Sequence, residues 1–201
     1  MRIGHFGGAF NPPHVGHLVC AQEAHAQLDL DVVVWVPVGQ APHREIPQDP
    51  GPEARFQMCD YATAGDERFG LSRIEVDRDG PSYTADTLRE LRERSPDDEL
   101  FVILGGDQAA ALPAWHEPDE VMRLTAIAVA ERGDSDRARV EESIGGRADL
   151  RFFDMPRIDI SSSMVRLRAR VGRPIRYLVP DKVASYVEAR SLYGAAAGAV
   201  S

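Results

Sequence analysis

The sequence contains few cysteines and no apolar run long enough to suggest a membrane segment. Cys20 and Cys59 are its only cysteines, and their separation matches no zinc-binding or redox-active spacing. We therefore expect both to be small, buried side chains of a protein in a reducing, cytoplasmic setting. A transmembrane helix needs roughly 20 consecutive apolar residues, and because no stretch approaches that length we expect no membrane partner.

Positive charge is also scarce. The chain has 23 Lys and Arg against 32 Asp and Glu, a formal net charge of −9. Nucleic-acid binding requires a basic stripe, and none is evident, so we expect no nucleic-acid partner. A small anionic substrate needs only a local cationic pocket, which this composition permits. The sequence leaves the oligomeric state open, a homo-oligomer included.

What the sequence does contain is the composition of a globular domain, with 43% hydrophobic and 27% charged residues. A length of 201 residues suits one core, so we predict a single domain over residues 1–201. Strand-like apolar runs alternate with helical patterns along the chain, which predicts an α/β fold with a doubly wound, mostly parallel sheet. Strands are expected at residues 2–6, 32–37, 69–76, 100–104, 125–130 and 150–153, and helices at 15–28, 53–64, 84–94 and 164–170.

Three other segments complete this organisation. Residues 39–52 contain several prolines and read as a long loop. Residues 134–147 are charged and weakly patterned, so they fit either a connection or a short helix. About 160–193 should form a small C-terminal helical part. In such a sheet the ligand crevice lies beyond the carboxyl ends of the strands, so binding motifs should come directly after strands.

The first such motif follows the first strand and reads Gly-Gly-Ala-Phe-Asn-Pro-Pro-His-Val-Gly-His, from Gly7 to His17. Glycines let backbone N–H groups approach an anion closely, and the N-terminus of the following helix favours negative charge. His14 and His17 are three residues apart at the start of that helix, so both side chains should lie on one face and hold one phosphate. The alternatives are two packed or capping histidines, or a zinc site, for which a third ligand is missing.

The second motif lies near the C-terminus, where Ile160, Ser161, Ser162 and Ser163 precede a helix and Arg166 follows one turn in. Serines at a helix start cap its free N–H groups, which is the ordinary role of such a run. The same hydroxyl and N–H groups can also bind an anion, and the arginine adds a fixed positive fork.

Both motifs resemble those of the nucleotidyltransferase superfamily with the T/HxGH signature, and within it those of the nicotinate mononucleotide adenylyltransferases. That family opens with Gly-Gly-Thr-Phe-Asp-Pro-x-His-x-Gly-His and carries Ile-Ser-Ser-Thr-x-Ile-Arg at the second place. Here Ala9 replaces the usual Thr or Ser and Asn11 the usual Asp, so a hydroxyl contact at position 9 is lost. The resemblance extends to Pro42-His43-Arg44, Pro81-Ser82-Tyr83-Thr84, Gly105-Gly106-Asp107, Trp115 and Tyr177-Leu178-Val179-Pro180.

This resemblance implies transfer of the adenylyl group of ATP to nicotinate mononucleotide, in NAD biosynthesis, with ATP and the mononucleotide as partners. His14 and His17 would be catalytic. Mg²⁺ would arrive with ATP, bound through phosphates and water, and no metal site of the protein itself is expected. The expected ATP contacts are Gly7, Gly8, Ala9, Phe10, Gly105, Asp107, Ile160, Ser161, Ser162, Ser163 and Arg166. The expected mononucleotide contacts are His43, Arg44, Tyr83, Thr84, Trp115 and His116.

Other interpretations remain for the chain and for single residues. It could act on another phosphate substrate, such as phosphopantetheine or glycerol phosphate, or be a catalytically silent nucleotide sensor. A fragment of a class I aminoacyl-tRNA synthetase shares the histidine signature but lacks room here for a tRNA-binding part. Asp107 could simply cap the next helix, Trp115 could be a core residue, and Arg44 could be a solvated charge.

Overall fold

A single six-stranded sheet forms the centre of the molecule in the computed structural model, which describes residues 1–42, 45–131 and 134–194. All neighbouring strands run parallel, in the order β3-β2-β1-β4-β5-β6. This confirms the doubly wound α/β class. The strands are β1 (Arg2–Gly8), β2 (Val32–Pro37), β3 (Phe69–Leu71), β4 (Glu99–Gly105), β5 (Ala126–Glu131) and β6 (Leu150–Asp154).

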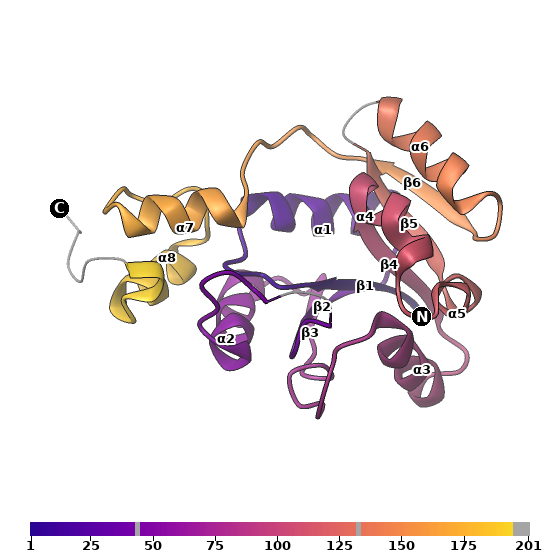
Figure 1. Cartoon of the computed structure of the whole chain (residues 1–201), viewed down its shortest axis with the longest axis horizontal. Coiled ribbons are helices and arrows are strands. Elements are labelled where there is room, and N and C mark those ends of the chain that lie inside the picture. The colour runs from indigo at the N-terminus through magenta and orange to yellow at the C-terminus, as the bar shows by residue number, and fades with distance from the viewer. Residues whose placement is uncertain (43–44, 132–133, 195–201) are drawn as a thin grey trace.

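Helices cover both faces of this sheet, as its near-continuous apolar strands require. In Figure 1, α1 (Val15–Gln27) lies above β1 and α3 (Thr84–Arg94) lies below it. Side chains of α3 share one apolar cluster with those of the short helices that follow β4 and with α6, whereas α1 belongs to the cluster of the opposite face. The remaining helices are α2 (Pro52–Thr63), α4 (Gly106–Ala111), α5 (Pro118–Leu124), α6 (Asp134–Ile144), α7 (Ser162–Arg170) and α8 (Asp181–Ala189), with 3-10 turns at Leu112–Ala114 and Leu192–Gly194.

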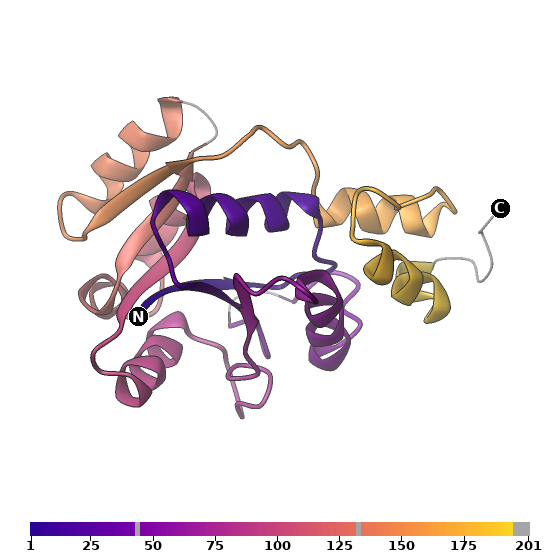
Figure 2. The ribbon, with the colours of Figure 1, turned by 180° about the vertical axis from the view of Figure 1, so that it is seen from behind.

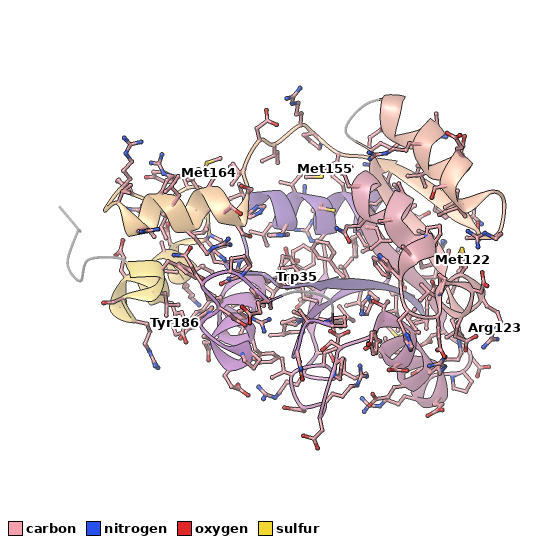
Figure 3. All side chains as sticks on the ribbon, viewed as in Figure 1. Trp35, Met122, Arg123, Met155, Met164 and Tyr186 are labelled. Atoms are coloured by element: carbon pink, nitrogen blue, oxygen red, sulfur yellow. The ribbon has the colours of Figure 1, made fainter. Side chains whose placement is uncertain are left out.

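Aromatic side chains fill the core between α1 and the sheet. Trp35 on β2 is fully buried, and Figure 3 shows it in the interior between α1 and the strands. Its ring centroid lies 5.1 Å from that of Phe6 and 4.8 Å from that of Phe10. Phe10 belongs to the turn after β1, so this packing anchors the start of the first motif to the core.

The C-terminal helices α7 and α8 lie at the end of the molecule away from the N-terminus (Figures 1 and 2). They bury a third apolar cluster, which includes Met58 of α2, Val165 of α7 and Val183 of α8. The backbone N–H of Val15, at the first turn of α1, donates to the carbonyl of Leu178 at 2.9 Å. The predicted helical part near residues 160–193 is therefore held against the beginning of α1.

The structure differs from the sequence expectations in two places and decides a third that the sequence leaves open. β3 ends at Leu71 instead of residue 76, because a turn closes there with the N–H of Asp77 donating to the carbonyl of Arg73 at 2.8 Å. The segment 134–144 is a helix, which settles the choice left open for it. Sequence reasoning missed α4 and α5, whose six and seven residues are too short to show a full helical period.

Both cysteines are buried, as expected from their isolation in the sequence. Burial raises the pKa of the Cys59 thiol, which keeps it protonated and unreactive. Within the described ranges, no helix combines the length and the apolar content that crossing a membrane requires.

The third cluster yields a stability prediction. Val165 is fully buried on α7, and Val171, which ends the same helix, is 56% exposed. Val165→Ala should lower the free energy of unfolding by about 2 kcal/mol, because two methyl groups leave a packed site. Val171→Ala removes the same atoms from the surface and should change stability much less. Urea denaturation of both variants measures this, and equal small losses would show that α7 is not part of a packed core.

Candidate active site

The candidate site lies where the direction of strand winding reverses, between β1 and β4. Chain connections leave these two neighbouring strands in opposite directions, which opens a crevice at their carboxyl ends. β1 ends at Gly8, and β4 ends at Gly105, which is also the N-cap residue of α4. The sequence motifs that follow these strands therefore face one crevice.

The turn after β1 is held by Arg55 of α2, a fully buried arginine. Its guanidinium donates to the carbonyls of Ala9 at 3.3 Å, Val38 at 2.6 Å and Gly39 at 3.0 Å. Its Nε donates to the Asp49 carboxylate at 2.8 Å. One cation thus joins the first motif, the end of β2 and the proline-rich loop.

His14 and His17 lie together at the first turn of α1. His14 is the N-cap residue, and its backbone N–H donates to Nδ1 of His17 at 3.1 Å. The two rings stack with centroids 3.8 Å apart. Because Nδ1 of His17 accepts a hydrogen bond, the proton of the neutral ring is on Nε2, which makes Nε2 a hydrogen-bond donor.

The second motif adjoins the first through α7. The Ser161 hydroxyl caps this helix by accepting from the N–H of Met164 at 3.2 Å, so the ordinary capping role of the serine run is present. The Ser162 hydroxyl donates to the carbonyl of Pro12 at 2.9 Å. Residues 150 positions apart in the chain are therefore in direct contact.

Arg166 is the second buried arginine of the site, with 8% of its surface exposed. It donates to the carbonyl of Asn11 at 2.8 Å, to the Gln48 side chain at 3.3 Å and to the Ser163 hydroxyl at 3.3 Å. A guanidinium has five N–H donors, so two have no partner among the described residues and can bind an anion.

Asn11 stands where the resembling family usually has Asp, and the structure gives a physical reason for the amide side chain. Its amide nitrogen donates to the carbonyl of Pro47 at 2.8 Å, and its amide oxygen accepts from the Tyr193 hydroxyl at 2.6 Å. Burial raises the pKa of Tyr193, so its hydroxyl stays protonated and remains a donor. A carboxylate at position 11 could accept from Tyr193 but would place an unprotonated oxygen against the Pro47 carbonyl.

The expected mononucleotide contacts that the structure describes, Tyr83, Thr84, Trp115 and His116, line a cavity of about 200 Å³ beside α3. Tyr83 is the N-cap residue of α3, and its ring stacks on that of His116 with centroids 4.1 Å apart. Thr84 and the half-buried Trp115 line the same cavity. An aromatic side chain and exposed helix-start N–H groups thus border a space of the size of a small ring.

A second cavity of about 200 Å³ connects this space to the first motif. Ser82, Thr84 and Trp115 belong to both cavities, while Gly7, Gly8 and Ala9 line only the second. The expected pyridine contacts and the glycine turn therefore border one continuous site. A larger cavity of about 780 Å³ lies under the 39–52 loop, and its lining includes none of the expected site residues that the structure describes.

Two of the expected ATP contacts, Asp107 and Ile160, have partners within the protein that the sequence does not predict. The Asp107 side chain is 87% exposed, pairs with Arg139 at 2.5 Å and makes no helix-capping hydrogen bond, so the capping alternative is wrong. Ile160 packs against the cluster of α7 and α8 and is partly buried there. His43 and Arg44 lie outside the described residues.

The donor set of the crevice fits phosphate oxygens and does not fit a protein-held cation. The Arg166 guanidinium and the serines of the second motif adjoin the first motif and its two imidazoles, and all these groups can donate hydrogen bonds to an anion. In the part of the chain that the structure describes, no three His, Cys, Asp or Glu side chains are grouped as metal ligands would be. A divalent cation here would be bound by the phosphates of a nucleotide and by water.

Sequence reasoning missed three buried polar residues around the site: Arg55, Glu75 and His5. The Glu75 carboxylate is 4% exposed and accepts from the Thr87 hydroxyl at 2.8 Å, and burial raises its pKa. His5 is 3% exposed in the middle of β1. The signal that could have found them is a charged or polar residue inside an otherwise apolar strand or helix pattern.

Comparisons with known proteins agree on the kind of protein that the chain is similar to. A sequence model of the family described as cytidylyltransferase-like matches residues 5–168. A probable nicotinate-nucleotide adenylyltransferase of Shouchella clausii is 42% identical over 193 residues, which cover 96% of this chain and 97% of the relative. One of Synechococcus sp. is 40% identical over 195 residues, with 96% and 94% covered.

A solved structure, Plasmodium falciparum nicotinic acid mononucleotide adenylyltransferase complexed with NaAD, superposes with a TM-score of 0.75. It shares 19% sequence identity, over 96% of this chain and 97% of that chain. This likeness shows a common fold.

The buried arginine of α2 yields the prediction for this site. Arg55→Met should lower the free energy of unfolding by roughly 3 kcal/mol, because Asp49 and three carbonyls lose their donor in a buried setting. Arg73→Met removes the same group from exposed ion pairs with Glu53 and Asp77, and the unfolding midpoint should hardly move. Urea denaturation followed by circular dichroism compares the two, and a similar shift for both would contradict the role given to Arg55.

Proposed function

The chain belongs to the cytidylyltransferase-like family and, within it, to the nicotinate-nucleotide adenylyltransferases, and from this we propose that it joins ATP and nicotinate mononucleotide. The products are nicotinate adenine dinucleotide and pyrophosphate, as a step of NAD biosynthesis. One observation carries the proposal: the two anion-binding motifs, 150 residues apart, meet at the turn that borders the Trp115 cavity.

The attacking group in this reaction is the 5′-phosphate of the mononucleotide. A phosphate monoester has a second pKa of about 6, so near neutral pH it already carries nearly two negative charges and needs no general base. Catalysis then consists of positioning the two substrates in line and stabilising charge on the α-phosphate. His14 and His17 donate to that phosphate, with the Nε2 proton of His17 set by its hydrogen bond at Nδ1.

The leaving pyrophosphate is bound by the second motif. The backbone N–H groups of Ser162 and Ser163 at the N-terminus of α7, the Ser163 hydroxyl and the two remaining N–H groups of Arg166 hold its oxygens. Gly7, Gly8, Ala9 and Phe10 contact the phosphates from the first turn. Ile160, Ser161, Gly105 and Asp107 complete the ATP contacts at the edges of the crevice.

Nucleotidyltransferases that use ATP generally require a divalent metal, and we propose Mg²⁺ for this one. When bound with ATP it neutralises charge on the phosphate oxygens. The pyridine mononucleotide is bound by Tyr83, Thr84, Trp115 and His116, and His43 and Arg44 stay predicted contacts of the same substrate. The division into one domain over 1–201 with a helical part at about 160–193, and the cytoplasmic location, stay predictions.

The role of His17 is tested by removing it. His17→Ala should lower kcat by about 10² to 10³ with a small change in the KM for ATP, as expected for losing one preorganised donor to a developing charge. His25→Ala removes a histidine from the far end of the same helix and should leave kcat unchanged. Pyrophosphate release measures both. Wild-type turnover in His17→Ala would show that this side chain takes no part in the reaction.

The identity of the substrate is tested with a panel of nicotinate mononucleotide, nicotinamide mononucleotide and phosphopantetheine. Backbone N–H groups near Thr84 and His116 prefer a charged acceptor, whereas a carboxamide must turn its own NH₂ donors toward them. We expect the acid to exceed the amide at least tenfold in kcat/KM.

Trp115→Ala should raise the KM of both pyridine mononucleotides and leave the KM for ATP unchanged, because stacking does not distinguish the acid from the amide. Turnover of phosphopantetheine alone would establish the other-substrate alternative. Pyrophosphate release with none of the three would favour a silent nucleotide sensor.

A further inference from the structure

His5 occupies an unusual position for a polar side chain. It lies in the middle of β1, between Val34 of β2 and Val102 of β4, and 3% of its surface is exposed. Its imidazole is on the same side of the strand as Gly7, where an added Cβ would lie 2.9 Å from Cε1 of the ring. Gly7 therefore leaves the space that the imidazole uses, beside the cavity that both residues line.

Neither ring nitrogen of His5 has a hydrogen-bond partner among the described residues. A buried polar group without a partner destabilises the folded state, and an apolar side chain would fill this place without that loss. Polar groups kept at such a cost are typical of functional sites. The cavity beside the ring is the one that also contains Thr84 and Trp115.

The charge state of His5 is set by its surroundings. Burial lowers its pKa to about 4, so near neutral pH the ring is uncharged and carries one N–H donor and one acceptor. Among the described residues, Glu75 is the other ionisable group that lines the same cavity, and its carboxylate already accepts from the Thr87 hydroxyl. His5 is therefore a neutral donor that no described residue of the protein uses.

We propose that His5 is a specificity-determining residue of the pyridine pocket, whose ring N–H donates a hydrogen bond to the carboxylate of the mononucleotide. The proposal rests on the proposed function. Trp115 would stack on the ring, which places the ring substituent in the continuous cavity between Thr84 and β1. A hydrogen bond from this donor to a charged carboxylate is stronger than one to a neutral carboxamide.

The kinetic test is His5→Leu, with His5→Gln as the conservative variant and His25→Leu as the matched control outside the cavity. For His5→Leu we expect a KM for nicotinate mononucleotide raised about tenfold, with the KM for ATP and kcat little changed. The KM for the amide should rise less, so the ratio of acid to amide efficiency falls. The melting temperature should stay or rise, because an unpartnered polar group is removed. His5→Gln keeps a donor and should recover most of the acid's affinity.

A spectroscopic test uses the unmutated enzyme and does not depend on a variant folding. In long-range ¹H–¹⁵N spectra of the histidine rings, saturating nicotinate mononucleotide should shift the His5 nitrogens, while ATP alone should leave them in place. Unshifted His5 nitrogens in the saturated enzyme would overturn the proposal. So would a folded His5→Leu variant with unchanged KM for the acid and a lowered melting temperature, which would make His5 a packing residue.

The same experiments separate this proposal from the function on which it rests. If the wild-type enzyme releases pyrophosphate with nicotinate mononucleotide, but the His5 nitrogens do not shift and His5→Leu leaves the KM unchanged, only the role of His5 is overturned. A wild-type enzyme that neither binds nor uses that mononucleotide overturns both.

Discussion

Two buried arginines fix the turn between β1 and α1, and the arrangement of the site depends on them. Arg55 reaches it from α2 and donates to Ala9, and Arg166 reaches it from α7 and donates to Asn11. Carbonyl oxygens of the turn thereby accept hydrogen bonds from buried side chains of the protein itself. The conformation of the turn is set before any phosphate binds, which is the condition for electrostatic stabilisation without reorganisation during the reaction.

This constraint also explains why distant parts of the chain converge. α7 must lie against the turn for Arg166 and Ser162 to reach it, and the apolar cluster shared by α2, α7 and α8 keeps it there. Tyr193, near the end of the described chain, adds a hydrogen bond to Asn11. The C-terminal helices therefore have a second task besides carrying the serine motif: they complete the environment of the first motif.

Much of the fold was predictable because its signals are local. The strand at residues 32–37 and the helix at 84–94 have the predicted bounds, since continuous apolar runs and a strong amphipathic pattern are read directly from neighbouring residues. The strand predicted to reach residue 76 ends at Leu71, because the following residues enter a turn whose buried carboxylate, Glu75, has its partner on another element. Pairings between residues of different elements produce no periodic pattern in the sequence, so they cannot be predicted from it.

The same limit applies to the site. Both histidines, the serines and Arg166 follow from motifs, and the structure brings the two motifs into contact through Ser162 and Pro12. Arg55 and His5 were not found, because a buried arginine or histidine becomes interpretable only when the groups around it are known. Asn11 was seen as a departure from the family pattern, but its reason lies in Pro47 and Tyr193, which are distant in the sequence.

The central claim is direct in-line transfer, with His14 and His17 as donors to the α-phosphate and not as nucleophiles. The stereochemistry at phosphorus tests it most directly. The enzyme would be given one diastereomer of adenosine 5′-(1-thiotriphosphate) with nicotinate mononucleotide, and the configuration at the thiophosphate of the dinucleotide would be determined. A single displacement predicts inversion. Retention would require a covalent adenylyl-enzyme, in which a histidine attacks first, and would contradict the account.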